Sequence, residues 1–341
     1  MLRATVKYGA LRTKVLSMYG QLLNEKDFEE LCNCRNLDEV CANLKSKGGW
    51  DEYLRKVSAS PSKEEFKSAL RKRTLAEYER LYKFSYFQDR LCLRSLTFRR
   101  DYERIKYTLR RLSGLKGGND PLLWDDCGVK SSLDMVALQN CEDYSGLIAA
   151  AKGSVFEKTL RSLPVSTETG LPVFGDACVL LESRYFSESF ALSTKKGKGF
   201  DKEKQCELIG FEADMLNIIN LIRLQRYIPS SLDNAESLLL PVKSKLRPSV
   251  MKKLLACRSE DELRNEVGKT AYGKYFTDKN KFDPEKAYRK ALVSFARKLV
   301  KMPQPGLYTA QAYLVLREQE CGTIQRIAEA VCCGADPKSA L

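Results

Sequence analysis

The chain has 341 residues, of which 43% are hydrophobic and 30% are charged, and its net charge is +14. This length is about twice that of a common domain, so two or three domains are expected. No stretch approaches the roughly 18 to 20 uninterrupted apolar residues that a membrane-spanning helix needs. The positive charge favours an acidic partner, but the basic residues are spread along the chain without a nucleic-acid-binding signature, which favours solvated lysines on helix faces.

Residues 1–20 are basic and superficially similar to a transit peptide. They contain no signal-type apolar core, and Tyr8, Leu11 and Val15 keep the spacing of one helix face. We therefore expect this stretch to be a helix of the fold, in a cytoplasmic protein.

Three segments, which begin at Leu31, Leu138 and Leu254, share one pattern of apolar residues. An aliphatic residue recurs nine positions after each start, and a further apolar residue follows four positions later. An aromatic residue comes next, and it is followed after four positions by another apolar side chain. The aromatic residues are Trp50, Phe156 and Tyr272. Spacings of four place side chains on one face of a helix, so the pattern predicts two short helices in each segment.

The nine-residue gap in each segment is expected to contain a turn. Asn36, Asp143 and Ser259 occupy the same position in it, and all three are strong N-cap residues. Glu39 and Glu262 complete predicted capping boxes in the first and third segments.

Other elements are predicted between these segments. Ser62 and Glu65 form a predicted capping box, and Asp283 followed by Pro284 predicts a helix start. TETGLPVF, from Thr167, is expected to be a short β or irregular piece, and GKGFDKEK, from Gly197, a solvated loop. No run of alternating strands occurs, so we predict an all-α fold.

Each segment is followed by a predicted helix with a polar residue at every third position, led by an acid. These three polar ladders consist of Asp101, Arg104, Tyr107 and Arg110; of Asp214, Asn217, Asn220 and Arg223; and of Glu320, Thr323, Arg326 and Glu329. In the second copy, FEADMLNIINLIRLQRY from Phe211, apolar residues flank the ladder on both sides, so this helix is expected to lie between neighbours.

The same order of elements therefore occurs three times: capped helix, aromatic helix, acid-led helix. Gly- and Pro-containing joints from Ser113 and from Ile228 separate the copies. We predict three helical repeats, at residues 1–118, 119–228 and 229–341, arranged with pseudo-threefold symmetry.

The acids that lead the ladders admit two interpretations. A buried carboxylate must be paired or accept hydrogen bonds, because leaving it alone costs several kcal/mol. Asp101, Asp214 and Glu320 could fix helix register by bonding to neighbouring backbone or arginines, or they could be partner contacts or acid/base groups. The threefold recurrence favours the architectural interpretation.

Sequence motifs for chemistry are scarce. Histidine is absent, and neither a phosphate-binding loop nor a dinucleotide fingerprint occurs. The 12 cysteines include no C-x-x-C pair, so we expect reduced thiols that mostly fill the core rather than a metal site. A glycosidase-type carboxylate pair stays open. We assign no catalytic, cofactor-binding or metal-binding residue.

The triplicated pattern, the opening KYGALRTKVLSMYGQLLNEKDFEELCNCRNLDEVCANL and the closing AYLVLREQECGTIQRIAEAVCCG together resemble one family. It is the C subunit of V-type and A-type rotary ATPases, whose eukaryotic counterpart is subunit d of the vacuolar proton pump. Tyr8, Arg12, the Asp214-x-x-Asn217 pair and the Glu318-x-Glu320 pair look like recurring positions of that family.

The resemblance implies three similar helical domains in a funnel. Its mouth would accept the rotor shaft, subunits D and F, and its base would rest on the proteolipid ring of the membrane sector. Such a subunit is peripheral to the membrane through protein contacts, binds neither nucleotide nor nucleic acid, and passes torque during ATP-driven proton or sodium transport or ATP synthesis. Two other hypotheses are a helical-repeat scaffold that binds an acidic protein or RNA, and a histidine-free enzyme.

Overall fold

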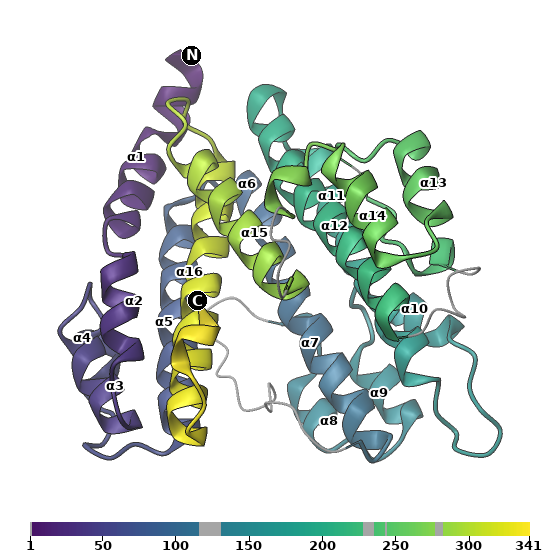
Figure 1. Cartoon of the computed structure of the whole chain (residues 1–341), viewed down its shortest axis with the longest axis horizontal. Coiled ribbons are helices and arrows are strands. Elements are labelled where there is room, and N and C mark those ends of the chain that lie inside the picture. Colours follow the sequence, from purple (N-terminus) through teal and green to yellow (C-terminus); the bar gives the residue numbers. More distant parts are fainter. Residues whose placement is uncertain (1, 116–130, 228–234, 243, 277–281) are drawn as a thin grey trace. The chain divides into compact units, whose positions relative to one another are not determined.

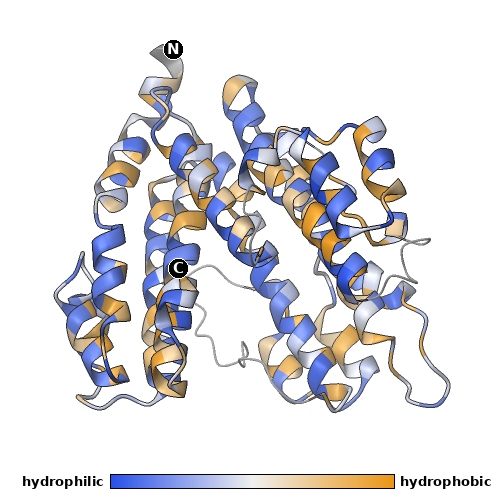
Figure 2. Ribbon diagram, in the orientation of Figure 1, coloured by the Kyte–Doolittle hydropathy of each residue, from blue (hydrophilic) through white to orange (hydrophobic). Residues whose placement is uncertain are grey.

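The computed structural model describes residues 2–115, 131–227, 235–242, 244–276 and 282–341. All the regular elements in these ranges are helices (Figure 1), which confirms the all-α prediction. The stretch from Thr167 is irregular, and a single antiparallel β-bridge pairs Val165 with Pro172 across it. Most helices of the described ranges carry both hydrophilic and hydrophobic residues (Figure 2), as expected of helices that bury one side.

The chain forms two compact units. The first combines residues 1–86 with residues 293–341, and the second comprises residues 87–292. The first unit therefore joins segments from both ends of the sequence. The partition into three repeats at 1–118, 119–228 and 229–341 stays a prediction.

The first unit is built around the long helices α5 and α16, which pack against each other (Figure 1). Its helices are α1 (Leu2–Tyr19), α2 (Glu25–Cys32), α3 (Leu37–Lys45), α4 (Asp51–Leu54), α5 (Lys63–Phe84), α16 (Leu307–Cys333) and the 3-10 helix η4 (Pro337–Ala340). Apolar side chains of α2, α3, α4 and α5 share one core with Ile324 and Ile327 of α16. The predicted N-terminal helix is present as α1, and Tyr8, Leu11 and Val15 are buried.

The second unit repeats this combination of short and long helices. Its helices are α6 (Phe87–Leu93), α7 (Ser95–Leu112), α8 (Met135–Gln139), α9 (Tyr144–Ala150), α10 (Glu157–Ser162), α11 (Phe174–Lys196), α12 (Gly199–Tyr227), α13 (Pro248–Ala256), α14 (Glu260–Gly268), the 3-10 helix η3 (Gly273–Tyr275) and the larger part of α15 (Pro284–Val300). One core joins apolar residues of α7 to those of α8, α9, α10 and α11.

The three predicted N-caps are confirmed. The side chain of Asn36 accepts a hydrogen bond from the Glu39 amide at 2.9 Å, and Asp143 and Ser259 cap α9 and α14 in the same way. Asp283 likewise accepts hydrogen bonds from the first amides of α15, as predicted.

The capping boxes predicted with Glu39, Glu262 and Glu65 are wrong in one detail. Glu39 and Glu262 accept hydrogen bonds from the amides of Arg35 and Arg258, one residue before each N-cap, both at 2.9 Å. The φ angle of the N-cap residue is −149° at Asn36 and −136° at Ser259, whereas it is −95° at Asn24, where the complete box forms. Glu65 similarly binds the Ser58 amide rather than the amide of Ser62. A complete capping box occurs at Asn24 and Asp27, where Asp replaces the expected Glu or Gln.

The three aromatic residues of the repeat are fully buried, and each stands immediately before a short helical turn. The turn after Tyr272 is a 3-10 helix rather than an α-helix. A side chain at Gly273 would meet the Gly268 carbonyl oxygen at 2.2 Å, so only glycine permits this close approach.

The solvated loop predicted from Gly197 is mostly helix. α11 ends at Lys196 and α12 begins at Gly199, so the connection is only two residues long. Polar pairs along the helix, such as Gln205 with Asp201 and Lys204 with Glu207, stabilise its first turns. The joint from Ser113 lies largely outside the described residues, whereas residues 235–242 and 244–249 of the joint from Ile228 are described.

The close packing at Gly210 leads to a prediction about stability. It lies inside α12, where an added Cβ would stand 2.7 Å from the Cβ of Ser244 in the segment before α13. We expect Gly210→Ala to push this segment from the helix and to lower the free energy of unfolding by about 1 to 3 kcal/mol. Denaturant unfolding of both variants would measure this. Gly9→Ala in α1 is the matched control, because nothing lies within 4 Å of its added Cβ. Equal stability of the two variants would contradict the packing argument.

Candidate functional site: the buried carboxylates

The acids that lead the three ladders are buried in the structure. The exposed fraction of the residue is 0% for Asp101 and Asp214 and 6% for Glu320. They lie on α7, α12 and α16, in the helices predicted to carry them. A buried carboxylate needs hydrogen-bond donors, and each of the three has them.

Asp101 binds the segment that precedes α8. Its carboxylate accepts hydrogen bonds from the hydroxyls of Ser131 and Ser132, both at 2.6 Å, and from the Ser132 amide at 3.1 Å. The guanidinium of Arg104, itself buried, lies 3.6 Å from the same carboxylate. The carboxylate of the first ladder thus fixes the entry to the second set of short helices.

Asp214 binds the segment that precedes α13. One oxygen, Oδ2, accepts hydrogen bonds from the amides of Ser244, Lys245 and Leu246 at 2.7 to 3.2 Å. The Tyr272 hydroxyl donates to the same oxygen at 2.6 Å. Through these contacts the single carboxylate joins α12, the loop before α13 and the turn after Tyr272. Hydrogen bonds to a carboxylate are stronger than those between neutral groups.

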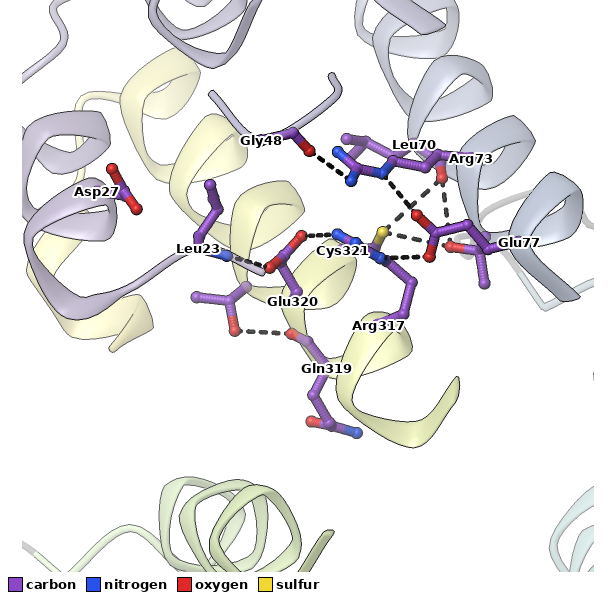
Figure 3. Close-up of polar contacts among 12 residues, drawn as sticks. Leu23, Asp27, Gly48, Leu70, Arg73, Glu77, Arg317, Gln319, Glu320 and Cys321 are labelled. Atoms are coloured by element: carbon purple, nitrogen blue, oxygen red, sulfur yellow. Dashed lines mark hydrogen bonds and ion pairs between the residues drawn. The ribbon is translucent and has the colours of Figure 1, made fainter. Parts of the chain in front are cut away.

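Glu320 makes the corresponding contact in the first unit. It accepts a hydrogen bond at 2.7 Å from the amide of Leu23, which precedes α2 (Figure 3). Its other oxygen pairs with the guanidinium of Arg317. Burial raises the pKa of Glu320, while Arg317 and the Leu23 amide act in the opposite direction.

These contacts follow one rule. Asp101 and Asp214 bind segments 30 to 32 residues further along the chain, at the start of the next set of short helices. Glu320 binds Leu23, which lies 297 residues earlier, at the start of the first set. The last acid therefore contacts the first copy in the way that each earlier acid contacts the copy after it.

A larger ionic cluster surrounds Glu320 in the first unit. Arg317 lies between Glu320 and Glu77, and its Nε donates to Glu77 at 2.7 Å (Figure 3). Arg73 donates to Glu77 at 3.1 Å and to the Gly48 carbonyl at 2.6 Å. Two buried cations thus balance two buried anions. Burial alone lowers the pKa of Arg317, but Glu320, Tyr313 and Glu77 together raise it above its ordinary value.

Sequence reasoning missed this cluster. Arg73 also stacks on the ring of Trp50, with 4.2 Å between the guanidinium carbon and the ring centroid. A comparable pair exists in the second unit, where Arg184 bonds to the carbonyl before Phe156 at 2.9 Å and pairs with Glu188 at 2.8 Å. The sequence contained a signal for both pairs, because α5 and α11 each carry Arg-x-x-x-Glu after the buried aromatic residue of the repeat.

The later ladder residues do not form one continuous buried line. Asn217 is buried and exchanges two hydrogen bonds with the main chain of Leu240. Arg110 is half-buried against Phe174, and Arg326 is half-buried and donates to Thr323 at 2.9 Å. Arg223 is exposed and pairs with Asn220 and Glu285. Of the buried ladder positions, Asp101, Asp214, Asn217 and Glu320 bind main chain and Arg104 pairs with Asp101, whereas the other ladder residues are half-buried or exposed.

These arrangements can hold loops and helices together. In the ranges that the structure describes, no group of three His, Cys, Asp or Glu residues is suited to hold a metal ion. None of the helices described is long and apolar enough to cross a membrane.

The comparison with protein families identifies the class. The model of the family described as ATP synthase (C/AC39) subunit matches residues 11–339. This match identifies the all-α chain as a subunit of the ATP synthase type. The chain belongs to the ATP synthase C/AC39 subunit family. A search of curated proteins gives no significant match.

The Asp214 contacts predict a large loss of stability on truncation. Asp214→Ala leaves the amides of Ser244, Lys245 and Leu246 and the hydroxyl of the buried Tyr272 without their acceptor, so we expect a loss of about 3 to 5 kcal/mol in the free energy of unfolding. Asp261→Ala, at an exposed aspartate of the same unit, should cost less than about 1 kcal/mol. Thermal and denaturant melts would measure both; normal stability of Asp214→Ala would be incompatible with the contacts described.

The buried phenol of Tyr272 should make the stability of the fold depend on pH in the alkaline range. Burial raises its pKa above the ordinary value, and the charge of Asp214 raises it further. The folded protein therefore keeps the phenol proton, whereas the unfolded chain releases it near pH 10. Stability from this group is complete below about pH 10 and falls by about 1.4 kcal/mol per pH unit above it. Because the phenol of the unfolded chain is only half ionised at pH 10, Tyr272→Phe should make the decline between pH 10 and 11 shallower by about 1 kcal/mol. Identical slopes in urea titrations of the two proteins would refute this.

Proposed function

We propose that this chain is a central-stalk subunit of a V/A-type rotary ATPase, and that it couples the rotor shaft, subunits D and F, to the membrane proteolipid ring. The family match over residues 11–339 is the observation that carries this proposal. In this role the subunit is not catalytic and transmits torque between the soluble head and the ring. It stays on the cytoplasmic side and associates with the membrane through protein contacts.

The buried carboxylates support a mechanical role. Each charge that crosses a membrane is worth about 2.3 kcal/mol per 100 mV, so a coupling part must resist loads of several kcal/mol. Asp214 ties three elements together through four hydrogen bonds to one oxygen. Densely packed helices joined by charge-assisted hydrogen bonds deform little under such loads.

We further infer that the predicted repeats form three equivalent modules whose boundaries fall inside the repeats. Each module would combine the short helices of one copy with the acid-led helix of the copy before it. The contacts of Asp101, Asp214 and Glu320 support this pairing. In this proposal the first module needs α16, because the acid that binds Leu23 comes from the third copy.

The test of the stalk function is purification from native membranes through an affinity tag on this chain. We expect the tagged chain to co-purify with the proteolipid ring and the two shaft subunits in one particle. Asp214→Ala should lower the amount of soluble chain and of particle in parallel, because it acts through folding. A stable wild-type chain that always elutes as a solitary monomer would contradict the proposed function.

A further inference from the structure

Large apolar side chains that remain exposed in the described part of the first unit lie on α1 and at or just beyond the C-terminal end of α5. They are Val6 on α1, Phe84 at the end of α5, and Tyr86, with exposed fractions of 76%, 51% and 54%. Helices α1 and α5 are in contact. Exposed apolar clusters of this kind mark interaction surfaces when polar residues surround them.

Two lysines accompany these apolar side chains. The ammonium of Lys7 lies 5.8 Å from the ring centroid of Tyr86, and that of Lys14 lies 5.8 Å from the centroid of Phe84. Each lysine is on α1, Phe84 is the last residue of α5 and Tyr86 lies two residues beyond it, so the cations stand beside the exposed rings. We call Val6, Lys7, Lys14, Phe84 and Tyr86 the lysine–aromatic patch.

On the α1 side of the patch, the charged side chains are all positive. Helix α1 contains no acidic residue, whereas its sequence includes Lys7, Arg12 and Lys14. The nearby Lys83 of α5 is neutralised by Glu79 at 2.7 Å. A partner that complements the patch therefore presents carboxylates to the two lysines and aliphatic side chains to the rings.

We propose that the lysine–aromatic patch binds an acidic segment with aliphatic side chains on a neighbouring protein subunit of the assembly. Family membership supports a protein occupant, because the chain is a subunit of a larger machine. Aromatic side chains are enriched at protein interfaces and at their energetic hot spots, and flanking charges contribute specificity for the partner and its register. This inference rests on the proposed function, which supplies the neighbouring subunits.

Site-specific photo-crosslinking in the purified holoenzyme tests the proposal. Phe84→p-benzoylphenylalanine keeps an aromatic ring at the patch, and Tyr227→p-benzoylphenylalanine is the control at an exposed tyrosine of the second unit. We expect the Phe84 probe to form a crosslink to another subunit, within a peptide of net negative charge. In the same background Lys7→Glu with Lys14→Glu should lower the yield about tenfold, whereas Lys195→Glu with Lys196→Glu should not change it.

The outcomes separate this inference from the function on which it rests. A crosslink within this chain, to lipid, or to a neutral or basic peptide overturns the proposed occupant, as does an intact holoenzyme without any crosslink from Phe84. Equal effects of the two lysine pairs also overturn it. Failure of the wild-type chain to co-purify with other subunits instead overturns the proposed function, and melts of each variant exclude misfolding as the cause of a lost crosslink.

Discussion

A buried carboxylate that accepts hydrogen bonds from main-chain amides is the interaction on which this structure depends. It occurs at Asp101, Asp214 and Glu320, each on a long helix and each facing the segment that introduces a set of short helices. Removing such a group strands buried donors, so the contact resists displacement more than an apolar contact of similar size does. It also fixes register, because only one position along the helix brings the acid to the amides.

The surroundings of the three acids differ in how their charge is compensated. Asp214 relies on amides and on the hydroxyl of Tyr272, and Asp101 relies mainly on two serine hydroxyls and one amide. Glu320 instead belongs to an ionic cluster with Arg317, Glu77 and Arg73. The residue three positions before each acid explains the difference. It is Phe98 or Phe211 before the two aspartates, but Arg317 before Glu320. The arginine brings a second carboxylate, Glu77, into the core to balance it.

Many of the helices and their caps could be predicted, because they depend on sequence patterns within a few residues. Helical spacing and N-cap chemistry depend on residues a few positions apart, so the caps at Asn36, Asp143 and Ser259 were predictable. The partners of the acids were not, because Leu23 and Glu320 meet only after the chain has folded. The shifted capping contacts of Glu39 and Glu262 depend on the backbone angle at the cap, which residue types do not specify.

Native-state hydrogen exchange on Glu320→Ala tests most directly whether the acid-led helices hold the short helices of another copy. We predict that amides at Leu23 and in α2 lose protection, although they lie almost 300 residues away in sequence, while the Lys245 amide in the second unit does not change. Arg326→Ala on the same helix should leave α2 protected. A loss of protection confined to α16 would contradict the interlocked arrangement and the mechanical role derived from it.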